Sequence, residues 1–302
     1  MNGSLITDMP MADYLLVDSL SSSACKALAS GSPYAWRNRV EKASPALSLG
    51  TLAHLAILEP DAFADAVVQP ECDIRTNAGK ETLVTWLTTL VGEPTIRPPV
   101  KAAVGTTLDL YLAELRPRLA TSGLTVITEE QRTLCLGMRE AIMGRDHTRS
   151  LIEADGECEI SGFTTDQDYG IPLKIRPDKL LSGAPIVLSL KTCQSVAERD
   201  YLRSAWTYGW HAAAFFYMRA MERITGERHR YWEACVESAP PFDCALYEYS
   251  DREIQEGESL MRRGMETYSR CVTENLWPGQ GYDWDAQEYT IRQIGRSDNY
   301  GG

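Results

Sequence analysis

The most informative part of the sequence runs from Lys174 to Lys179 (Lys-Ile-Arg-Pro-Asp-Lys) and resumes at Ser189-Leu190-Lys191-Thr192. Short β-compatible runs lie between residues 157 and 191, and polar turns at 166–170 and 181–185 separate them. This alternation of β-compatible runs and turns predicts a three-stranded meander with Asp178 on one strand and Lys191 on the next. Because side chains alternate along a strand, residues 189 and 191 share one face of the predicted sheet.

An acid and a lysine on adjacent strands suit the hydrolysis of a phosphodiester. The reaction needs an activated water molecule and a means of neutralising the charge that develops on the phosphoryl oxygens. Mg²⁺ does both, and it prefers oxygen ligands such as two carboxylates from neighbouring strands. A lysine two residues after the second acid would orient the water or stabilise the transition state. Asp178 and Lys191 occupy the positions of the first acid and the lysine, whereas Ser189 stands where the second acid belongs.

The length and composition are those of a globular protein with a full core. With 302 residues and 44% hydrophobic content, the chain is expected to form a single elaborated domain over residues 1–302. We expect its approximate catalytic core at residues 150–225 and a helical N-terminal part that contains His54. The tail at residues 297–302 is expected to be flexible.

Charge and cysteine content limit the function classes. The net charge of -12 and the pI of about 4.9 argue against broad attraction to a polyanion, so any contact with DNA must rely on a local basic surface. The 8 cysteines include no Cys-x-x-Cys pair, which favours free thiols in a reducing cytosol over a zinc or iron–sulfur site. The sequence has no apolar stretch of about 18 residues, so we expect no membrane segment and a cytoplasmic location.

Helices are predicted on both sides of the meander. The apolar segment from Ser48 to Pro60 is expected to form a mostly buried helix that carries His54. Thr128-Glu129-Glu130-Gln131 has the spacing of a capping box and predicts a helix to about Met143. Further helices are predicted at 198–224 and 250–275, whereas the segment 71–101 is expected to be a variable connector with one short helix.

Several segments share their order and spacing with a known family of nucleases. The first is a Gly-x-x-x-His-x-x-x-Leu-Glu-Pro pattern from Gly50 to Pro60, which contains His54. The others are Glu159 before the Pro-Asp pair, Arg176-Pro177-Asp178-Lys179, Lys191-Thr192, and the helical segment from Trp210 to Tyr217. In order and spacing, the match covers roughly residues 20 to 290, which is most of the chain. The set resembles the RecB-like branch of the PD-(D/E)XK nucleases, and within that branch the exonuclease VIII (RecE-type) recombination exonucleases of phages and prophages.

The resemblance implies a fold, an activity and partners. The implied fold is α/β, a central mixed β-sheet flanked by helices, with helical additions at the N- and C-terminal ends. The implied activity is 5′-to-3′ digestion of linear double-stranded DNA with Mg²⁺, which Mn²⁺ is able to replace. Family members form closed homo-oligomers around DNA ends and work beside a single-strand annealing protein, which suggests the cytoplasm of a bacterial host. His54 and Asp178 would bind the metal, and Lys191 would activate water.

Two positions depart from the family pattern. Ser189 replaces the second acid, and Ala213 replaces a glutamine in the helix after the meander. A serine hydroxyl is neutral and a poor ligand for Mg²⁺, so the site loses one negative charge. Two substitutes are open: Glu198 at the start of the next helix, with Asp200 nearby, or Glu159 on a neighbouring strand.

A positive strip lies beside these acids. Lys174, Arg176 and Lys179, together with Thr192, are the predicted contacts to the phosphate backbone of DNA. A solvated strand face explains the three basic residues almost as well. His54 also has two interpretations, a metal ligand or a core histidine of an apolar helix, and the surrounding signature favours the ligand.

Three functions are compatible with these observations. The first is a metal-dependent exonuclease that acts on the ends of double-stranded DNA. The second, from a different class, is a nuclease-fold protein with an impaired site that binds DNA or recruits a partner. The third is an endonuclease or accessory subunit within a larger complex. Loss of an end label from linear DNA would support the first, whereas retarded but intact DNA would support the second.

Overall fold

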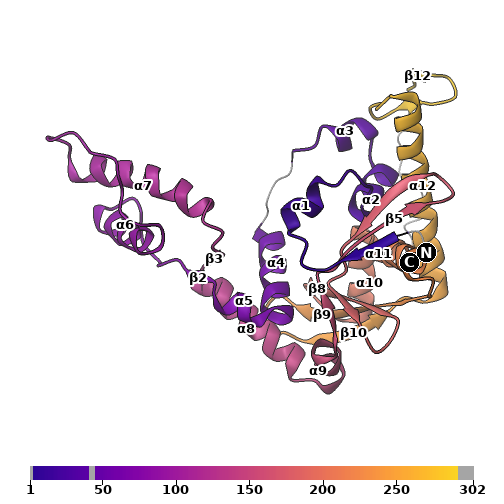
Figure 1. Cartoon of the computed structure of the whole chain (residues 1–302), viewed down its shortest axis with the longest axis horizontal. Coiled ribbons are helices and arrows are strands. Elements are labelled where there is room, and N and C mark those ends of the chain that lie inside the picture. Colours follow the sequence, from indigo (N-terminus) through magenta and orange to yellow (C-terminus); the bar gives the residue numbers. More distant parts are fainter. Residues whose placement is uncertain (1–2, 41–44, 292–302) are drawn as a thin grey trace.

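A computed structural model describes residues 3–40 and 45–291 of the chain (Figure 1). Its centre is a five-stranded sheet with the strand order β10-β9-β8-β7-β4. β8 and β9 are parallel and the other neighbours are antiparallel, so the predicted mixed sheet is confirmed. The predicted flexible tail, residues 297–302, lies outside the described residues. The strands are β4 (Gly156–Cys158), β7 (Lys179–Leu181), β8 (Ile186–Cys193), β9 (Arg230–Glu237) and β10 (Cys244–Glu248).

Helices cover both faces of this sheet, as the predicted fold class requires. The alternation of β8 separates two cores, since Val187 packs into one of them whereas Leu188 and Leu190 pack into the other. The core of Val187 lies under α2 (Ser22–Ser30), α11 (Trp210–Thr225) and α12 (Asp251–Glu274). The core of Leu188 and Leu190 lies under α4 (Pro45–Leu58) and α8 (Glu129–Met143).

The prediction of a three-stranded meander at residues 157–191 is wrong. The region forms five strands, because β5 (Ser161–Asp166) and β6 (Ile171–Ile175) lie between β4 and β7. These two strands leave the central sheet and pair with β1 (Gly3–Ile6) in an antiparallel sheet of order β1-β5-β6. Two local breaks explain the division. Glu159 adopts a left-handed backbone conformation after β4, and Pro177 lacks the N–H that would extend the ladder beyond β6.

The helix predictions differ in their success. α8 begins with the predicted capping box, in which the Thr128 side chain accepts from the Gln131 amide while the Gln131 side chain accepts from the Thr128 amide. The helix predicted at 198–224 is two helices, α10 (Glu198–Tyr208) and α11. Gly209 separates them with φ 63°, a left-handed conformation that glycine adopts at little cost.

The segment 71–101, predicted to be a connector with one short helix, does contain one helix, but that helix has 15 residues and is part of a helical arm. α6 (Asn77–Val91) and α7 (Val104–Ala120) pack on each other and project from the body of the molecule (Figure 1). They enclose a small core of their own, formed by Leu83, Leu87, Leu112 and Leu115. Leu83 and Leu87 are spaced by four residues and therefore share one helix face, which is the periodicity that the Gly and Pro residues of this region obscured.

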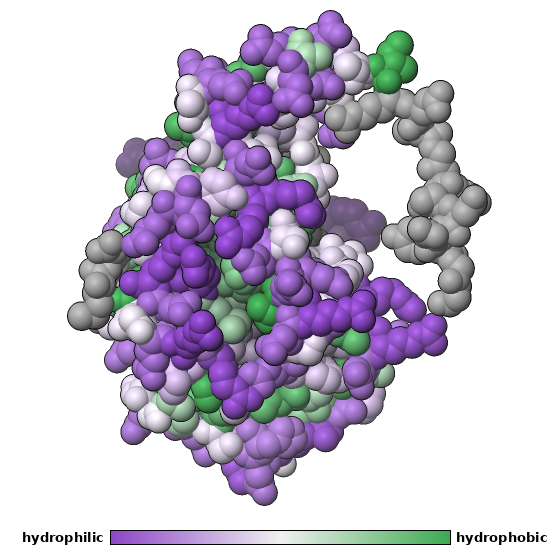
Figure 2. All heavy atoms as spheres, turned by 90° about the vertical axis from the view of Figure 1, so that its right-hand side faces the viewer, coloured by the Kyte–Doolittle hydropathy of each residue, from purple (hydrophilic) through white to green (hydrophobic). Residues whose placement is uncertain are grey.

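Short elements complete the structure, and polar residues predominate on the side that carries α12 (Figure 2). None of the helices in the described ranges combines the length and the apolar character needed to cross a membrane. The side of the molecule that carries α12 is mainly hydrophilic, with apolar residues scattered among polar ones (Figure 2). The short elements are α1 (Met11–Leu16), α3 (Pro33–Arg37), α5 (Pro60–Ala64), α9 (Asp146–Glu153), β2 (Val67–Val68), β3 (Val126–Ile127), β11 (Tyr282–Asp283) and β12 (Glu288–Tyr289).

Candidate metal centre

A close approach between α4 and β8 positions His54. Gly50 lies against β8, and a Cβ atom at residue 50 would come within 3.3 Å of the Thr192 hydroxyl oxygen. The missing side chain therefore allows the helix to pack close to the strand. His54 follows four residues later on the same side of the helix, and its Nδ1 atom is 3.6 Å from Oδ1 of Asp178. The Gly-x-x-x-His spacing thus has a packing reason.

Three potential metal ligands meet at this point. One nitrogen of His54 and one carboxylate oxygen each from Glu159 and Asp178 all lie within 4.8 Å of one another. The side chains are partly buried, with 27% of His54 and 18% of Asp178 exposed. They come from α4, from the residue after β4, and from the bend before β7. Three separate segments of the chain therefore converge on one partly shielded place.

Glu159 has an unusual backbone conformation. Its φ of 52° lies in the left-handed region, which costs a non-glycine residue roughly 1 kcal/mol or more. Arg176 holds the side chain, because its Nε donates a 2.8 Å hydrogen bond to Oε2 of Glu159. Burial raises the pKa of Glu159, and the charge of Asp178 acts in the same direction against the effect of Arg176. A bound cation would reduce the electrostatic repulsion between two carboxylates held this close together.

Ser189 connects the two remaining members of the motif. Oδ2 of Asp178 accepts hydrogen bonds of 2.7 Å from the Ser189 hydroxyl and from the Leu190 amide. The same hydroxyl accepts a 2.6 Å hydrogen bond from Nζ of Lys191. Serine is able to do this because a hydroxyl both donates and accepts. Asp178 is therefore oriented, and Lys191 is linked to it, without a second acid on β8.

Lys191 keeps its positive charge in this environment. Burial acts to lower the pKa of its ammonium group, but the negative charges of Asp178 and Glu233 act against burial, and the net direction is upward. The group is therefore protonated at neutral pH. A cationic lysine can donate hydrogen bonds to a phosphoryl oxygen and stabilise charge that develops there.

The structure does not bring Glu198 into the ligand group. Glu198 begins α10 in an exposed position, where its charge acts on Tyr247, and Asp200 pairs with Arg203 at 3.4 Å. Among the described residues, the group of close metal-binding atoms contains Glu159 instead. Of the two substitutes predicted for the missing acid, the geometry favours Glu159.

The predicted positive strip is wrong for its two lysines, because both are buried. Lys174 is 8% exposed and Lys179 is 5% exposed. Each ammonium group binds carbonyl oxygens at the C-terminal end of a helix, where the helix dipole favours a cation. The lysines hold helices in place and are not free to contact phosphate. The carbonyls belong to Tyr14, Leu15 and Val17 at the end of α1 for Lys174, and to Ile152 of α9 for Lys179.

Arg176 and Thr192 are engaged inside the protein as well. Only 12% of the Arg176 side chain is exposed, and its Nη1 donates to the Met9 carbonyl and the Ser161 hydroxyl. Thr192 lies against Gly50 of α4. The four residues predicted to contact DNA therefore do not form an exposed strip, and Arg176 serves to hold Glu159.

Sequence reasoning missed Glu233 of β9. It lies in register with Ser189 on the neighbouring strand, and it is 0% exposed. A signal was available, because Glu233 is the single charged residue in the otherwise apolar and aromatic run from Tyr231 to Val236. A lone acid in such a run costs free energy unless it has partners, which makes it a candidate for function.

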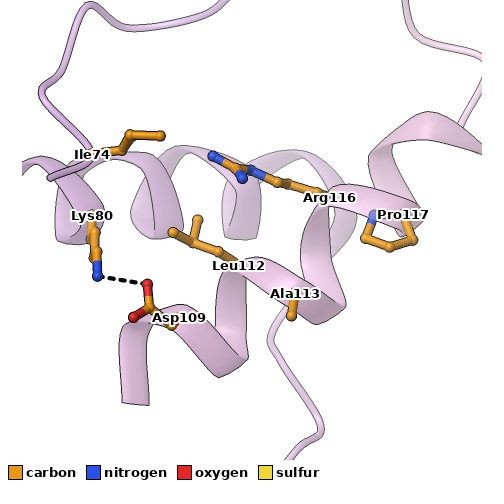
Figure 3. Close-up of a pocket in the computed structure, with 7 residues that line it drawn as sticks. All are labelled: Ile74, Lys80, Asp109, Leu112, Ala113, Arg116 and Pro117. Atoms are coloured by element: carbon orange, nitrogen blue, oxygen red, sulfur yellow. Dashed lines mark ion pairs between the residues drawn. The ribbon is translucent and has the colours of Figure 1, made fainter. Parts of the chain in front are cut away.

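A pocket on the arm lies apart from this group. It has a volume of about 370 Å³, lies between α6 and α7, and is lined in part by Ile74, Leu112 and Arg116 (Figure 3). An ion pair of 2.6 Å between Nζ of Lys80 and Oδ1 of Asp109 lies at its edge. It shares no residue with the three converging ligands.

Lys26 of α2 provides a test of the electrostatics near the site. Burial lowers the pKa of Lys26 to about 8 from 10.5, and the charge of Lys191 acts in the same direction. A depressed folded-state pKa means that the stabilising contribution is present above pH 10.5 and is lost as the pH falls through about 8. Lys26→Met is therefore expected to raise the midpoint of thermal unfolding at pH 7 by a few degrees.

Calorimetry of both proteins between pH 7 and pH 10.5 checks this expectation. The gain from Lys26→Met should fade as the pH rises, because the native lysine loses its charge. Lys101→Met, at an exposed position of the arm, serves as the control and should change the midpoint little at any pH. A gain that grows with pH would contradict the direction assigned to the Lys26 pKa.

The sequence matches a described protein family over most of its length. A family model described as a PDDEXK-like domain of unknown function (DUF3799) matches residues 18–287. No curated protein matches the chain. The family match covers all of the residues that form the candidate site.

Three solved structures were found to be similar. A protein provisionally named an exonuclease, from Eubacterium rectale, has a TM-score of 0.56 and 12% identity over 97% of each chain. A phage-related exonuclease from Haemophilus somnus has a TM-score of 0.29 and 9% identity over 64% of this chain and 95% of its own. The alkaline exonuclease LHK-Exo from Laribacter hongkongensis has a TM-score of 0.22 and 16% identity over 63% of this chain and 96% of its own. Only the first similarity supports the fold of this chain.

Proposed function

This chain belongs to the PDDEXK-like family, and from that premise we propose that it is a metal-dependent deoxyribonuclease. The observation that carries the proposal is the convergence of His54, Glu159 and Asp178 close to Lys191. The most specific form of the proposal is a 5′-to-3′ exonuclease that acts on linear double-stranded DNA during phage or prophage recombination.

The donor set fits a divalent cation. One imidazole nitrogen and two carboxylate oxygens offer the hard and borderline ligands that Mg²⁺ and Mn²⁺ accept. His54, Glu159 and Asp178 would hold the ion. Because Mn²⁺ tolerates a nitrogen ligand better than Mg²⁺ does, we expect both ions to support activity and Mn²⁺ to do so at lower concentration. When bound, the ion supplies Lewis acidity toward the phosphoryl group and lowers the pKa of water.

The protein's own residues would orient the metal ligands and stabilise the charge that develops on the phosphoryl group. Ser189 and the Leu190 amide hold the Asp178 carboxylate in one orientation, and Arg176 does the same for Glu159. Lys191, protonated and hydrogen-bonded to Ser189, would stabilise negative charge on the phosphoryl oxygens or orient the attacking water. The site would therefore combine three metal ligands, two of them carboxylates, with one fixed ammonium group.

The net charge of the chain bears on how it would hold DNA. With a charge of -12, the surface as a whole repels a polyanion. We propose a closed homo-oligomer around the DNA, because positive charge need then line only the inner surface. A single-strand annealing protein would act beside it in the cytoplasm of a bacterial host. We also propose that residues 1–302 act as one elaborated domain.

A second candidate function rests on Ser189. Its hydroxyl is neutral and already donates to Asp178, so the ligand group lacks one of the family's carboxylates. A site impaired in this way would leave a nuclease-fold protein that binds DNA or recruits a partner. A third possibility, an endonuclease or accessory subunit, differs from the first in needing no DNA end.

An assay on labelled DNA separates these functions. Linear duplexes labelled at the 5′ or the 3′ end and a closed circular duplex are incubated with protein and Mg²⁺, Mn²⁺ or a chelator. Metal-dependent release of the 5′ label, with the circle intact, is the expected result. Cleavage of the circle would indicate an endonuclease, and intact but retarded DNA with either ion would contradict the enzymatic proposal.

A further inference from the structure

Glu233 of β9 lies beside Ser189 of β8, the position at which the family pattern has an acid. β8 and β9 are parallel, and their register sets Ser189 opposite Glu233 and Lys191 opposite Cys235. Residues 189, 191 and 233 therefore project from the same face of the sheet. Adjacent strands are about 4.8 Å apart, so a carboxylate at position 233 is within reach of the groups on β8.

The surroundings of Glu233 leave part of its carboxylate uncompensated. The residue is 0% exposed, and its Oε2 accepts hydrogen bonds from the hydroxyls of Tyr201, at 2.5 Å, and Tyr249, at 2.7 Å. Its Oε1 is buried and has no hydrogen-bond partner among the residues that the structure describes. Burying a carboxylate is unfavourable unless an opposite charge or a full set of donors compensates for it. Two cations are coupled to Glu233, Lys26 of α2 and Lys191 of β8, and Lys191 has the stronger effect on its pKa.

Electrostatic coupling between the two groups is reciprocal. Burial raises the pKa of Glu233, and Lys191 is the largest influence that opposes this rise. The charge of Glu233 in turn raises the pKa of Lys191, after that of Asp178. The charge of Lys191 is therefore coupled to two acids, Asp178 and Glu233, although β8 itself carries none.

We propose that Glu233 is a positioning residue for Lys191, and that it supplies from β9 the negative charge that Ser189 does not supply from β8. This inference rests on the proposed function, because it explains how Lys191 stays charged and in place at a site with one acid fewer. Glu233 acts through Lys191 and is not itself in the ligand group formed by His54, Glu159 and Asp178.

A purely structural role makes a different prediction. The two tyrosine hydroxyls tie α10 and the end of β10 to the sheet through Glu233. If anchoring were its only role, the loss of its charge would loosen the protein in general and would not single out Lys191. A negative charge restored at position 189 would then repair nothing.

Chemical modification of Lys191 in the metal-free protein tests the inference without requiring nuclease activity. Reductive methylation with formaldehyde reacts with the neutral amine, and mass spectrometry of peptides follows each lysine at one fixed pH. Glu233→Gln keeps the shape and the hydrogen-bond acceptor but removes the charge. We expect it to lower the pKa of Lys191 and to speed its modification about tenfold, which corresponds to one pKa unit.

Several matched comparisons make the result decisive. Glu237→Gln removes a carboxylate four residues further along β9 and should leave the modification of Lys191 near the wild-type rate. The double variant Ser189→Asp with Glu233→Gln should return the rate toward wild type. Lys174 and Lys179, both buried, should stay unmodified in every variant and so report an intact fold. If Glu233→Gln does not fold, Glu233→Met removes the charge with an apolar side chain of similar volume.

Three outcomes would overturn the inference. The first is an unchanged rate at Lys191 in folded Glu233→Gln. The second is a faster rate shared with Lys174 and Lys179, which would show general opening. The third is a double variant that remains fast. If wild-type protein does not cut DNA, the proposed function fails while the modification result stands. If it does cut, we expect Glu233→Gln to slow cleavage about 10- to 100-fold and Ser189→Asp to restore it.

Discussion

Lys191→Met is expected to slow metal-dependent cleavage of DNA by about a thousandfold, ~4 kcal/mol in activation free energy, without weakening the binding of the metal. Methionine keeps the length and apolar stem of the lysine side chain but removes the ammonium group that donates to Ser189. Because that ammonium repels a cation, its loss should leave the affinity for Mn²⁺ equal to or higher than that of the wild-type protein. Single-turnover cleavage and titration calorimetry measure the two quantities separately.

Asp178→Asn is expected to weaken metal binding as well as cleavage, in contrast to Lys191→Met. Asparagine still offers an oxygen to the Ser189 hydroxyl and the Leu190 amide, so the local fold is retained, but the charge proposed to bind the metal is lost. Both metal affinity and cleavage should fall. Asp155→Asn, at an exposed position before β4, is the matched control and should behave as wild type.

The lysine prediction has its own contradicting outcome. Cleavage by Lys191→Met within tenfold of the wild-type rate would exclude the role assigned to the lysine.

Ser189→Asp is expected to strengthen the binding of Mn²⁺ about a hundredfold and to raise the cleavage rate, because it restores a carboxylate beside Asp178. The Ser189 hydroxyl oxygen lies 2.7 Å from Oδ2 of Asp178, so the new acid would lie next to the existing one. Without metal, two adjacent carboxylates resist ionisation together, and the folded protein binds more protons than the unfolded chain. The stability of the metal-free variant should therefore fall as the pH rises above about 4, and added Mn²⁺ should recover it.

Thermal unfolding at pH 5 and pH 8, with and without Mn²⁺, measures this effect. Ser189→Asn is the control, since it matches the size of aspartate without its charge. Equal metal dependence in the Asp and Asn variants would show that charge is not what the site lacks. A wild-type protein that already binds Mn²⁺ as tightly as Ser189→Asp would mean that His54, Glu159 and Asp178 suffice as ligands.

Much of the candidate site could be predicted from short patterns. Gly50 and His54 are one helical turn apart, and Pro177 and Asp178 are adjacent, so local geometry relates the members of each pair. Lys191 could be placed relative to Ser189 for the same reason, since residues two apart share a face of a strand. The capping box at Thr128 succeeded because its hydrogen bonds join residues only three apart.

Predictions failed where a partner was distant in the chain. Lys174 and Lys179 resembled a basic surface strip, yet their ammonium groups bind carbonyls of α1 and α9, which no local pattern links to them. The segment 71–101 was predicted to be a connector with one short helix because of its Gly and Pro residues, whereas the core of the arm is formed by leucines on two helices that meet only in the folded state. Three strands were predicted where the structure has five, because β5 pairs with β1, which lies about 160 residues earlier in the sequence.

Local sequence was enough to predict the α/β nuclease fold and to select His54, Asp178 and Lys191 as candidate site residues, because covalent neighbours and strand or helix periodicity constrain them directly. Only long-range packing places Glu159, and not Glu198, close to His54 and Asp178, and sets Glu233 beside Ser189. The physical reason is that charge interactions depend on distance in space. The pairing of β8 with β9 and the packing of α4 on β8 set that distance, and spacing along the chain does not.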